Sequence, residues 1–275
     1  MDTFARDGLT FDVVDSGPAD GDVVVLLHGF PQTATSWSAV SEILNANGFR
    51  TLAPTQRGYS PRARPRGRLR YRTSTLAGDV VALNETLGGR QVHVVGHDWG
   101  AIVAWSLAAS RPDLVRTLTT VSVPHPRAFL RSLLRSRQLL RSWYILFFQL
   151  PWLPEFVISR AGDALPAALA RTGMTADEAA VVRREVIDSG ALTYALNWYR
   201  ALVLDGVGPT RRTVSVPTTH VWSSGDTALD RCGAELCHEH VTADFRLEVL
   251  DGASHWIPDQ HPVELAGIVL ERIGR

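Results

Sequence analysis

The chain alternates between short apolar runs and longer segments whose apolar residues recur at helical spacing. Strands are predicted at residues 9–17, 22–27, 50–53, 91–95, 115–123, 216–222 and 245–250. Helices are predicted at residues 37–45, 73–87, 101–110 and 262–273, the second of them opening at a Ser/Thr cap and ending at Gly88-Gly89. Strands that alternate with helices at this spacing predict an α/β fold with a mostly parallel, doubly wound sheet.

Strand signals stop between Pro126 and Pro209. This segment is rich in leucine, alanine, arginine and aromatic residues at helical spacing, which predicts helices only. We therefore expect a core domain formed by residues 1–125 and 210–275, with a helical cap domain at 126–209 inserted after the sixth strand.

Composition narrows the classes of protein that the chain can represent. It has 275 residues, enough for one α/β domain with a sizeable insertion, and 45% of them are hydrophobic. Its 28 basic and 28 acidic residues balance, which argues against disorder and against a polyanionic partner. Six arginines alternate with other residues at positions 62–72. A solvated loop is favoured there over a nucleic-acid or lipid-surface site, and we expect no nucleic-acid partner.

The expected location is the cytoplasm. The N-terminus has neither a basic start nor an apolar run, so no signal peptide is predicted. The most apolar stretch, residues 143–158, is too short and too interrupted for membrane insertion.

Cys232 and Cys237 suit a reducing compartment, and with His238 and His240 they form a C-x4-C-H-x-H pattern. This spacing fits no common structural zinc site, so two free thiols, no metal and no organic cofactor are expected.

Gly96-His97-Asp98-Trp99-Gly100 lies between a predicted buried strand and a predicted helix. Small residues around one reactive side chain at such a junction are typical of a nucleophile elbow, although the pentapeptide alone also fits a loop with an N-capping aspartate. The nucleophile here would be Asp98. A carboxylate that attacks a saturated carbon forms an ester, which water can then hydrolyse. Aspartate at this position therefore favours epoxide opening or dehalogenation over esterase or peptidase chemistry.

Three further segments sit at the ends of predicted strands. His28-Gly29-Phe30-Pro31 follows one of them, and its Phe30 N–H together with the Trp99 N–H would form an oxyanion hole. Asp226 follows another and is the candidate acid, while Asp230 more plausibly caps the next helix. The segment at 122–125 contains no carboxylate that could serve instead. His255 follows the last strand and is the candidate base, which completes the order nucleophile, acid, base.

Several of these motifs together resemble the epoxide hydrolases of the α/β-hydrolase superfamily over nearly the whole chain. The motifs are residues 28–31 (HGFP), 56–60 (QRGYS), 96–100 (GHDWG), 195–200 (ALNWYR) and 254–256 (SHW). The resemblance implies an Asp-nucleophile hydrolase in which two cap tyrosines hold the epoxide oxygen. Tyr199 matches the second tyrosine motif. Tyr144 matches the first less closely, because Ile145 stands where the family often has glutamine.

The resemblance and the residue chemistry together imply a reaction through an alkyl ester of Asp98. Tyr144 and Tyr199 would donate to the epoxide oxygen, and a water activated by His255, itself oriented by Asp226, would hydrolyse the ester. The partners expected are a small apolar epoxide and water, and the chain would be a monomer or homodimer. The residues expected to line the substrate pocket are His28, Phe30, Trp99, His125, Phe147, Trp198 and Trp256.

Two other functions remain open from the sequence. A haloalkane dehalogenase shares the nucleophile and base but needs a second N–H donor for the halide, for which Trp143, Trp152 and Trp198 are candidates. A non-catalytic ligand-binding protein of the same fold is the remote alternative, and it would bind without turnover.

Overall fold

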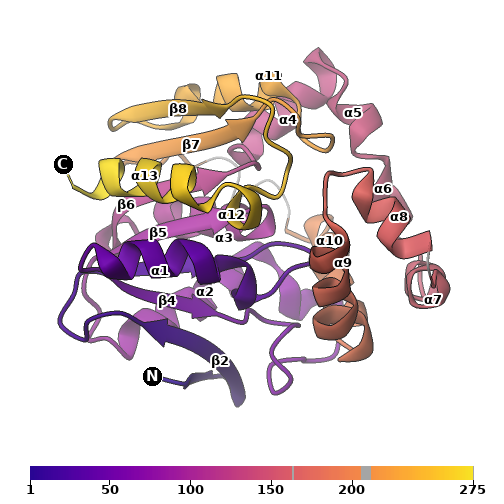
Figure 1. Cartoon of the computed structure of the whole chain (residues 1–275), viewed down its shortest axis with the longest axis horizontal. Coiled ribbons are helices and arrows are strands. Elements are labelled where there is room, and N and C mark those ends of the chain that lie inside the picture. The colour runs from indigo at the N-terminus through magenta and orange to yellow at the C-terminus, as the bar shows by residue number, and fades with distance from the viewer. Residues whose placement is uncertain (163, 206–211, 275) are drawn as a thin grey trace.

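The computed structural model describes residues 1–162, 164–205 and 212–274, and in these its strands form one sheet of eight (Figure 1). The strands are β1 Thr3–Arg6, β2 Leu9–Ser16, β3 Val23–Leu27, β4 Arg50–Pro54, β5 Val92–His97, β6 Val115–Val121, β7 Thr218–Ser223 and β8 Phe245–Leu250. Their order is β1-β2-β4-β3-β5-β6-β7-β8, and only the β1–β2 and β2–β4 pairs are antiparallel. The predicted α/β class and mostly parallel sheet are confirmed. The edge strand β1 was not predicted.

Helices cover both faces of the sheet, which buries the apolar side chains that β3 and β5 present on each side (Figure 1). On one face lie α1 Ser38–Ala46 and α13 Pro262–Ile273, and on the other lie α2 Thr73–Glu85 and α3 Trp99–Ser110. Shorter elements of the core are η1 Ala34–Trp37, η2 Arg68–Tyr71, η3 Pro112–Leu114, α11 Arg231–Glu235, η6 Leu236–His240 and α12 Ile257–Gln260. This layering leaves the carboxyl ends of the strands as the open edge of the core.

A separate group of helices follows β6 and lies at that end of the sheet (Figure 1). It comprises α4 Pro126–Arg135, α5 Gln138–Arg141, α6 Trp143–Phe147, α7 Leu153–Arg160, α8 Ala164–Ala170, α9 Ala176–Val182, η4 Arg183–Asp188 and α10 Leu192–Leu202. The cap boundary expected between residues 209 and 210 lies outside the described residues. The division into a core and a cap domain therefore remains a prediction.

The start of α2 differs from the sequence-based expectation of a local Ser/Thr cap. Arg72 occupies the N-cap position without a side-chain cap, and Thr73 is the first helical residue. The carboxylate of Asp205, which follows α10, instead accepts hydrogen bonds from the Thr73 N–H (2.9 and 3.1 Å to its two oxygens) and from the Thr73 hydroxyl. A carboxylate is favourable at a helix N-terminus, so this contact both caps α2 and ties α10 to the core.

Candidate active site

The turn between β5 and α3 holds Asp98 in a conformation that L-residues rarely adopt, with φ 51° and ψ −119°. The turn is tight enough to require glycine on both sides. A Cβ on Gly100 would lie 2.0 Å from the carbonyl oxygen of Leu27, and one on Gly96 would lie 2.3 Å from that of Gly100. The surrounding packing must hold Asp98 in this strained backbone conformation. Strained backbone conformations are common at functional positions.

The structure brings Asp98, Asp226 and His255 together, from the ends of three different strands. Nδ1 of His255 lies 2.7 Å from Oδ2 of Asp226, and Nε2 lies 3.6 Å from Oδ2 of Asp98. All three side chains are buried. The Nε2 distance is longer than a hydrogen bond, so the imidazole is anchored to Asp226 and can interact with a group beside Asp98.

Backbone amides and a neighbouring helix hold the Asp226 loop in place. Oδ1 of Asp226 accepts hydrogen bonds from the N–H groups of Ala228 (2.7 Å) and Leu229 (2.9 Å). The guanidinium of Arg141, on α5, donates to the carbonyls of Asp226 (2.9 Å) and Leu229 (3.0 Å). Asp230 caps α11 by accepting from the Cys232 N–H at 3.1 Å, which confirms the prediction that it is a helix cap.

The surroundings of Asp226 and His255 favour the charged form of each of these two side chains. Burial by itself would raise the pKa of Asp226, but the charge and hydrogen bond of His255 and two backbone N–H groups lower it below its ordinary value. Burial by itself would lower the pKa of His255. The charge and hydrogen bond of Asp226, followed by the nearby carboxylate of Asp98, instead raise it to about 10. His255 therefore keeps its proton at neutral pH, and Asp226 stays ionised.

The loop after β3 approaches Asp98 from the other side. The Phe30 N–H donates to Oδ1 of Asp98 at 2.8 Å, and a Cβ on Gly29 would lie 2.4 Å from Cβ of Asp98. The Trp99 N–H begins α3 and is one of the amides that a helix leaves without an internal carbonyl partner. These are the two amides expected to form the oxyanion hole, and one of them already binds the carboxylate.

Tyr144 on α6 and Tyr199 on α10 face the same space as Asp98. Their ring centroids are 6.0 Å apart, and the Tyr199 ring meets that of Trp99 edge-on at 4.9 Å. Burial raises the pKa of both phenols well above the ordinary value, and the negative charge of Asp98 raises it further. Both hydroxyls therefore keep their protons and can act as hydrogen-bond donors.

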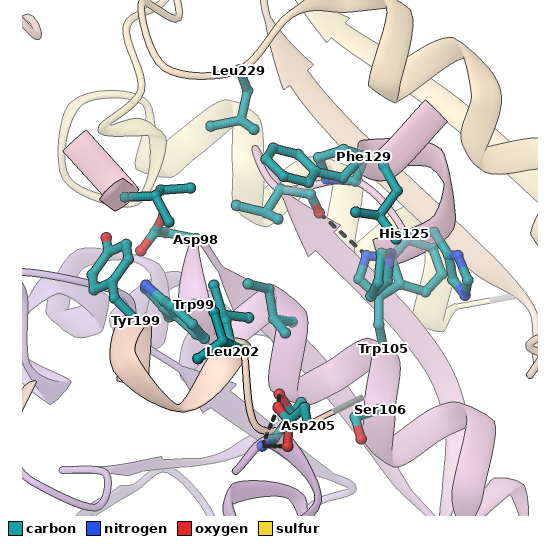
Figure 2. Close-up of a pocket in the computed structure, with 18 of the residues that line it drawn as sticks. Asp98, Trp99, Trp105, Ser106, His125, Phe129, Tyr199, Leu202, Asp205 and Leu229 are labelled. Carbon is teal, nitrogen blue, oxygen red and sulfur yellow. Dashed lines mark hydrogen bonds between the residues drawn. The ribbon is translucent and has the colours of Figure 1, made fainter. Parts of the chain in front are cut away.

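A cavity of about 360 Å³ contains Asp98 and both tyrosines in its lining. Figure 2 shows Asp98, Trp99 and Tyr199 close together on one side of it, with Trp105 and His125 across the space. The rest of the lining is mainly apolar and includes Ile102, Val123, Phe129, Leu130, Ile145, Leu202 and Leu229. The volume lies at the small end of the range for ligand pockets, about 300–1,000 Å³.

Of the residues expected to line the pocket, Trp99 and His125 do so, whereas Phe30 is not among the lining residues but packs against the ring of Tyr199 at 5.3 Å. His28, Phe147, Trp198 and Trp256 are not among the lining residues.

Hydrogen bonds direct three of these four side chains elsewhere. The indole N–H of Trp198 donates to the Arg57 carbonyl (2.8 Å), and that of Trp256 donates to the Thr172 hydroxyl (3.0 Å). His28 is fully buried, and its Nε2 accepts from the Gln56 N–H at 3.0 Å.

Three lining residues of α3, namely Ile102, Trp105 and Ser106, were missed at the sequence level. Ile102 and Trp105 follow Trp99 at intervals of three residues and therefore share one face of the helix. The three-residue spacing from Trp99 could have identified these side chains as cavity-lining from the sequence alone. His97 also lies next to the site, since its Nε2 is 2.9 Å from the carbonyl oxygen of His255 and its ring is 4.9 Å from the His255 ring.

The segment with the cysteine–histidine pattern, residues 232–240, contacts His125, which lines the cavity. Cys237 is buried, and its sulfur accepts a hydrogen bond from the His125 N–H at 3.2 Å, while the ring of His240 stacks on that of His125 at 4.6 Å. In the part of the chain that the structure describes, no group of three His, Cys, Asp or Glu side chains is placed to hold a metal ion. No helix in the same residues has the length and hydropathy needed to cross a membrane.

A doubly wound sheet with a strained strand-to-helix elbow and a covered cavity at its carboxyl edge is the architecture of an α/β hydrolase. The family model for the alpha/beta hydrolase fold matches residues 22–262. The AB hydrolase superfamily protein YfhM of Bacillus subtilis is 34% identical, with 96% of this chain and 94% of that protein aligned. Epoxide hydrolase 3 of Xenopus tropicalis is also 34% identical, over 95% of this chain and 74% of that protein.

Solved structures agree with the sequence comparison. An epoxide hydrolase of Vigna radiata superposes with a TM-score of 0.83 at 25% identity, covering 99% of this chain and 97% of that one. The chain therefore belongs to the α/β-hydrolase fold family and, within it, to the epoxide hydrolases.

Proposed function

We propose that the protein opens a small apolar epoxide to a vicinal diol through a covalent ester on Asp98. The observation that carries this proposal is one carboxylate and two phenols in the lining of a single apolar cavity, with the imidazole of His255 3.6 Å from that carboxylate. Curated relatives named epoxide hydrolases support the substrate class. The aspartate at the elbow supports the covalent route, because its alkyl ester can be hydrolysed.

In the first step a carboxylate oxygen of Asp98 attacks one carbon of the epoxide ring. The ring C–O bond breaks, its electrons go to the oxygen, and Tyr199 or Tyr144 donates a proton to that oxygen. No group leaves, so the enzyme gains the whole mass of the substrate. The two phenols suit this role because their pKa is raised above the ordinary value, so each enters the reaction protonated.

In the second step water attacks the carbonyl carbon of the ester. Esterification removes the negative charge of Asp98, which is one of the groups that raise the pKa of His255. The histidine can then release its proton, which restores the phenol ionised in the first step, and accept one from the attacking water, while Asp226 keeps it oriented. The bond between the carbonyl carbon and the alkyl oxygen then breaks, and that oxygen takes the proton of the new carboxyl group, which leaves the diol and the Asp98 carboxylate. The N–H groups of Phe30 and Trp99 would stabilise the oxyanion, and one such donor contributes about 3 kcal/mol in related sites.

Isotope labelling tests the covalent route directly. A single turnover in H2¹⁸O is expected to place the label in the carboxylate of Asp98, because water attacks the ester at the enzyme's own carbonyl carbon. Digestion of the protein and mass spectrometry of the peptide that contains Asp98 would measure it. Label found only in the diol would mean that water attacks the epoxide directly, and would refute the ester.

The candidate donors for halide binding argue against dehalogenation. The side chains of Trp143 and Trp152 are 65% and 70% exposed, and neither lines the cavity. The indole N–H of Trp198 is already bonded to the carbonyl of Arg57. Trp99 would thus have to bind a halide without help from any of these three indoles.

Replacing Tyr199 with phenylalanine should slow formation of the ester by about 10²-fold, since a positioned general acid typically contributes 10²- to 10⁴-fold. The substitution keeps the ring that packs against Trp99 and Phe30. Stopped-flow fluorescence under single-turnover conditions would measure the rate. The matched variant Tyr144→Phe shows whether the two phenols contribute equally, and an unchanged rate in Tyr199→Phe would remove it from the mechanism.

A further inference from the structure

The helices that follow β6 carry an exposed apolar face on their outer side. Helices α5, α6 and α7 run along the edge of the molecule that lies farthest from α1 and α13 (Figure 1). Six large apolar side chains between the end of α4 and the start of α7 are more than half exposed: Leu134, Leu139, Leu140, Trp143, Leu146 and Trp152. We call these six residues the outer apolar face. Apolar side chains gathered in this number on a surface mark an interaction site.

The charges near this face are mostly positive, although Arg131 is paired with Glu239 and Arg141 lies 4.0 Å from Asp230. Residues 126–160 contain six arginines and a single glutamate, although the whole chain is electrically balanced. Arg127, Arg135, Arg137 and Arg160 are exposed. The glutamate, Glu155, is bound on its inner side by Arg200, with N–O distances of 2.6 and 2.8 Å. The excess of positive charge that the solvent meets beside these leucine and tryptophan side chains therefore comes from the four exposed arginines.

The same helices also form one wall of the cavity. Leu130, on α4, is 48% exposed and also lines the cavity, and α6 contributes Tyr144 and Ile145 to the lining. Helices α4 and α6 thus carry residues both of the outer apolar face and of the cavity wall that contains one of the two phenols. An apolar molecule that leaves a lipid phase at this face would have a short path to Asp98.

We propose that the outer apolar face docks on the surface of an anionic lipid bilayer. The leucine and tryptophan side chains enter the interface between headgroups and acyl chains, and the surrounding arginines bind the anionic headgroups. This arrangement delivers apolar epoxides dissolved in the bilayer to the cavity. Only that delivery rests on the proposed function, because the docking itself follows from apolar exposure and charge.

A second copy of this chain is a poorer occupant for the same face. A two-fold dimer would press the face against itself and bring Arg135, Arg137 and Arg160 of both copies together. Like charges that meet across an interface are unfavourable. An anionic bilayer offers both an apolar phase and the opposite charge.

Flotation with lipid vesicles tests the docking. The protein should bind vesicles of phosphatidylcholine with about 30% phosphatidylglycerol at least about ten-fold more strongly than phosphatidylcholine alone, and high salt should weaken this binding. The variant R135E/R137E should lose about ten-fold or more of it, since each basic residue near such a surface is worth about 1 kcal/mol, or five-fold. The variant L134S/L140S should also bind more weakly.

Matched controls place equivalent changes away from the outer apolar face. The variant R90E/R116E makes the same change in charge at residues next to the amino ends of β5 and β6, and V263S removes an exposed apolar side chain from α13. Both controls should bind vesicles as the parent protein does. Equal loss of binding in R90E/R116E and R135E/R137E would overturn the docking site, because overall charge alone would then explain it.

Three further results would overturn the proposal. The first is failure to bind either kind of vesicle. The second is a concentration-dependent dimer in sedimentation that L134S/L140S abolishes. The third is binding to single-stranded DNA as strong as binding to vesicles, if the variant L134S/L140S still binds the DNA equally well. That result would assign the face to a polyanion. None of these measurements uses an epoxide, so they can fail or succeed independently of the proposed reaction.

Discussion

Replacing Asp98 with alanine is expected to lower the rate of epoxide hydrolysis by about 10⁴-fold or more, the scale of loss seen when a nucleophile is removed from other hydrolases. The reason is geometric. Asp226 is held by His255 and by two backbone amides, so it cannot take the place of the missing carboxylate. The turnover number measured at neutral pH with a small aryl or alkyl epoxide would record the loss.

Asp230 provides the matched control for this experiment. It lies four residues after Asp226 in the same loop, but its carboxylate caps α11 instead of facing the cavity. Asp230→Ala should cost about 1 kcal/mol of the free energy of unfolding, as loss of a helix cap does, and should leave turnover within a few-fold of the parent. Retention of activity in Asp98→Ala would contradict the proposed nucleophile.

The parts of the fold and site that could be predicted are those whose signals are local. Buried parallel strands have continuous apolar runs, and the open edge of such a sheet collects the residues that directly follow its strands. Asp98, Asp226 and His255 each follow a strand, and β5, β6, β7 and β8 are consecutive neighbours in the sheet. Their proximity therefore follows from strand position, and the structure brings them within hydrogen-bonding or ion-pairing distance.

The parts that could not be predicted depend on contacts distant in sequence. The carboxylate that caps α2 comes from Asp205, 132 residues after Thr73. Likewise, the identity of an aromatic residue does not reveal which way its ring points. Trp198 and Tyr199 are neighbours on α10, yet the Trp198 indole bonds to Arg57 while Tyr199 lines the cavity. Strand β1 has four residues and lies at the sheet edge, so its apolar pattern is too short to read.

Replacing His255 with glutamine should separate the two chemical steps. The first step needs the Asp98 carboxylate and a phenol, so one equivalent of epoxide should still react. The second step needs a base for water, so the ester should accumulate and the steady-state rate should fall by about 10³-fold or more. Intact-protein mass spectrometry would detect the ester as a gain equal to the full mass of the epoxide.

The size of that gain also distinguishes the two chemistries that an aspartate nucleophile permits. Epoxide opening expels nothing, whereas a bromoalkane loses its halide and adds only the alkyl group. Incubating His255→Gln with each compound in turn therefore reports the substrate class and the covalent step in one measurement.

In the parent enzyme, hydrolysis of the ester should accelerate as pH rises through the pKa of His255 in the ester. That pKa lies below the value of about 10 in the resting enzyme, because the ester no longer carries the charge of Asp98. An ester that never accumulates in His255→Gln, while the variant remains folded and turns over slowly, would remove His255 as the base and leave water attack to another group.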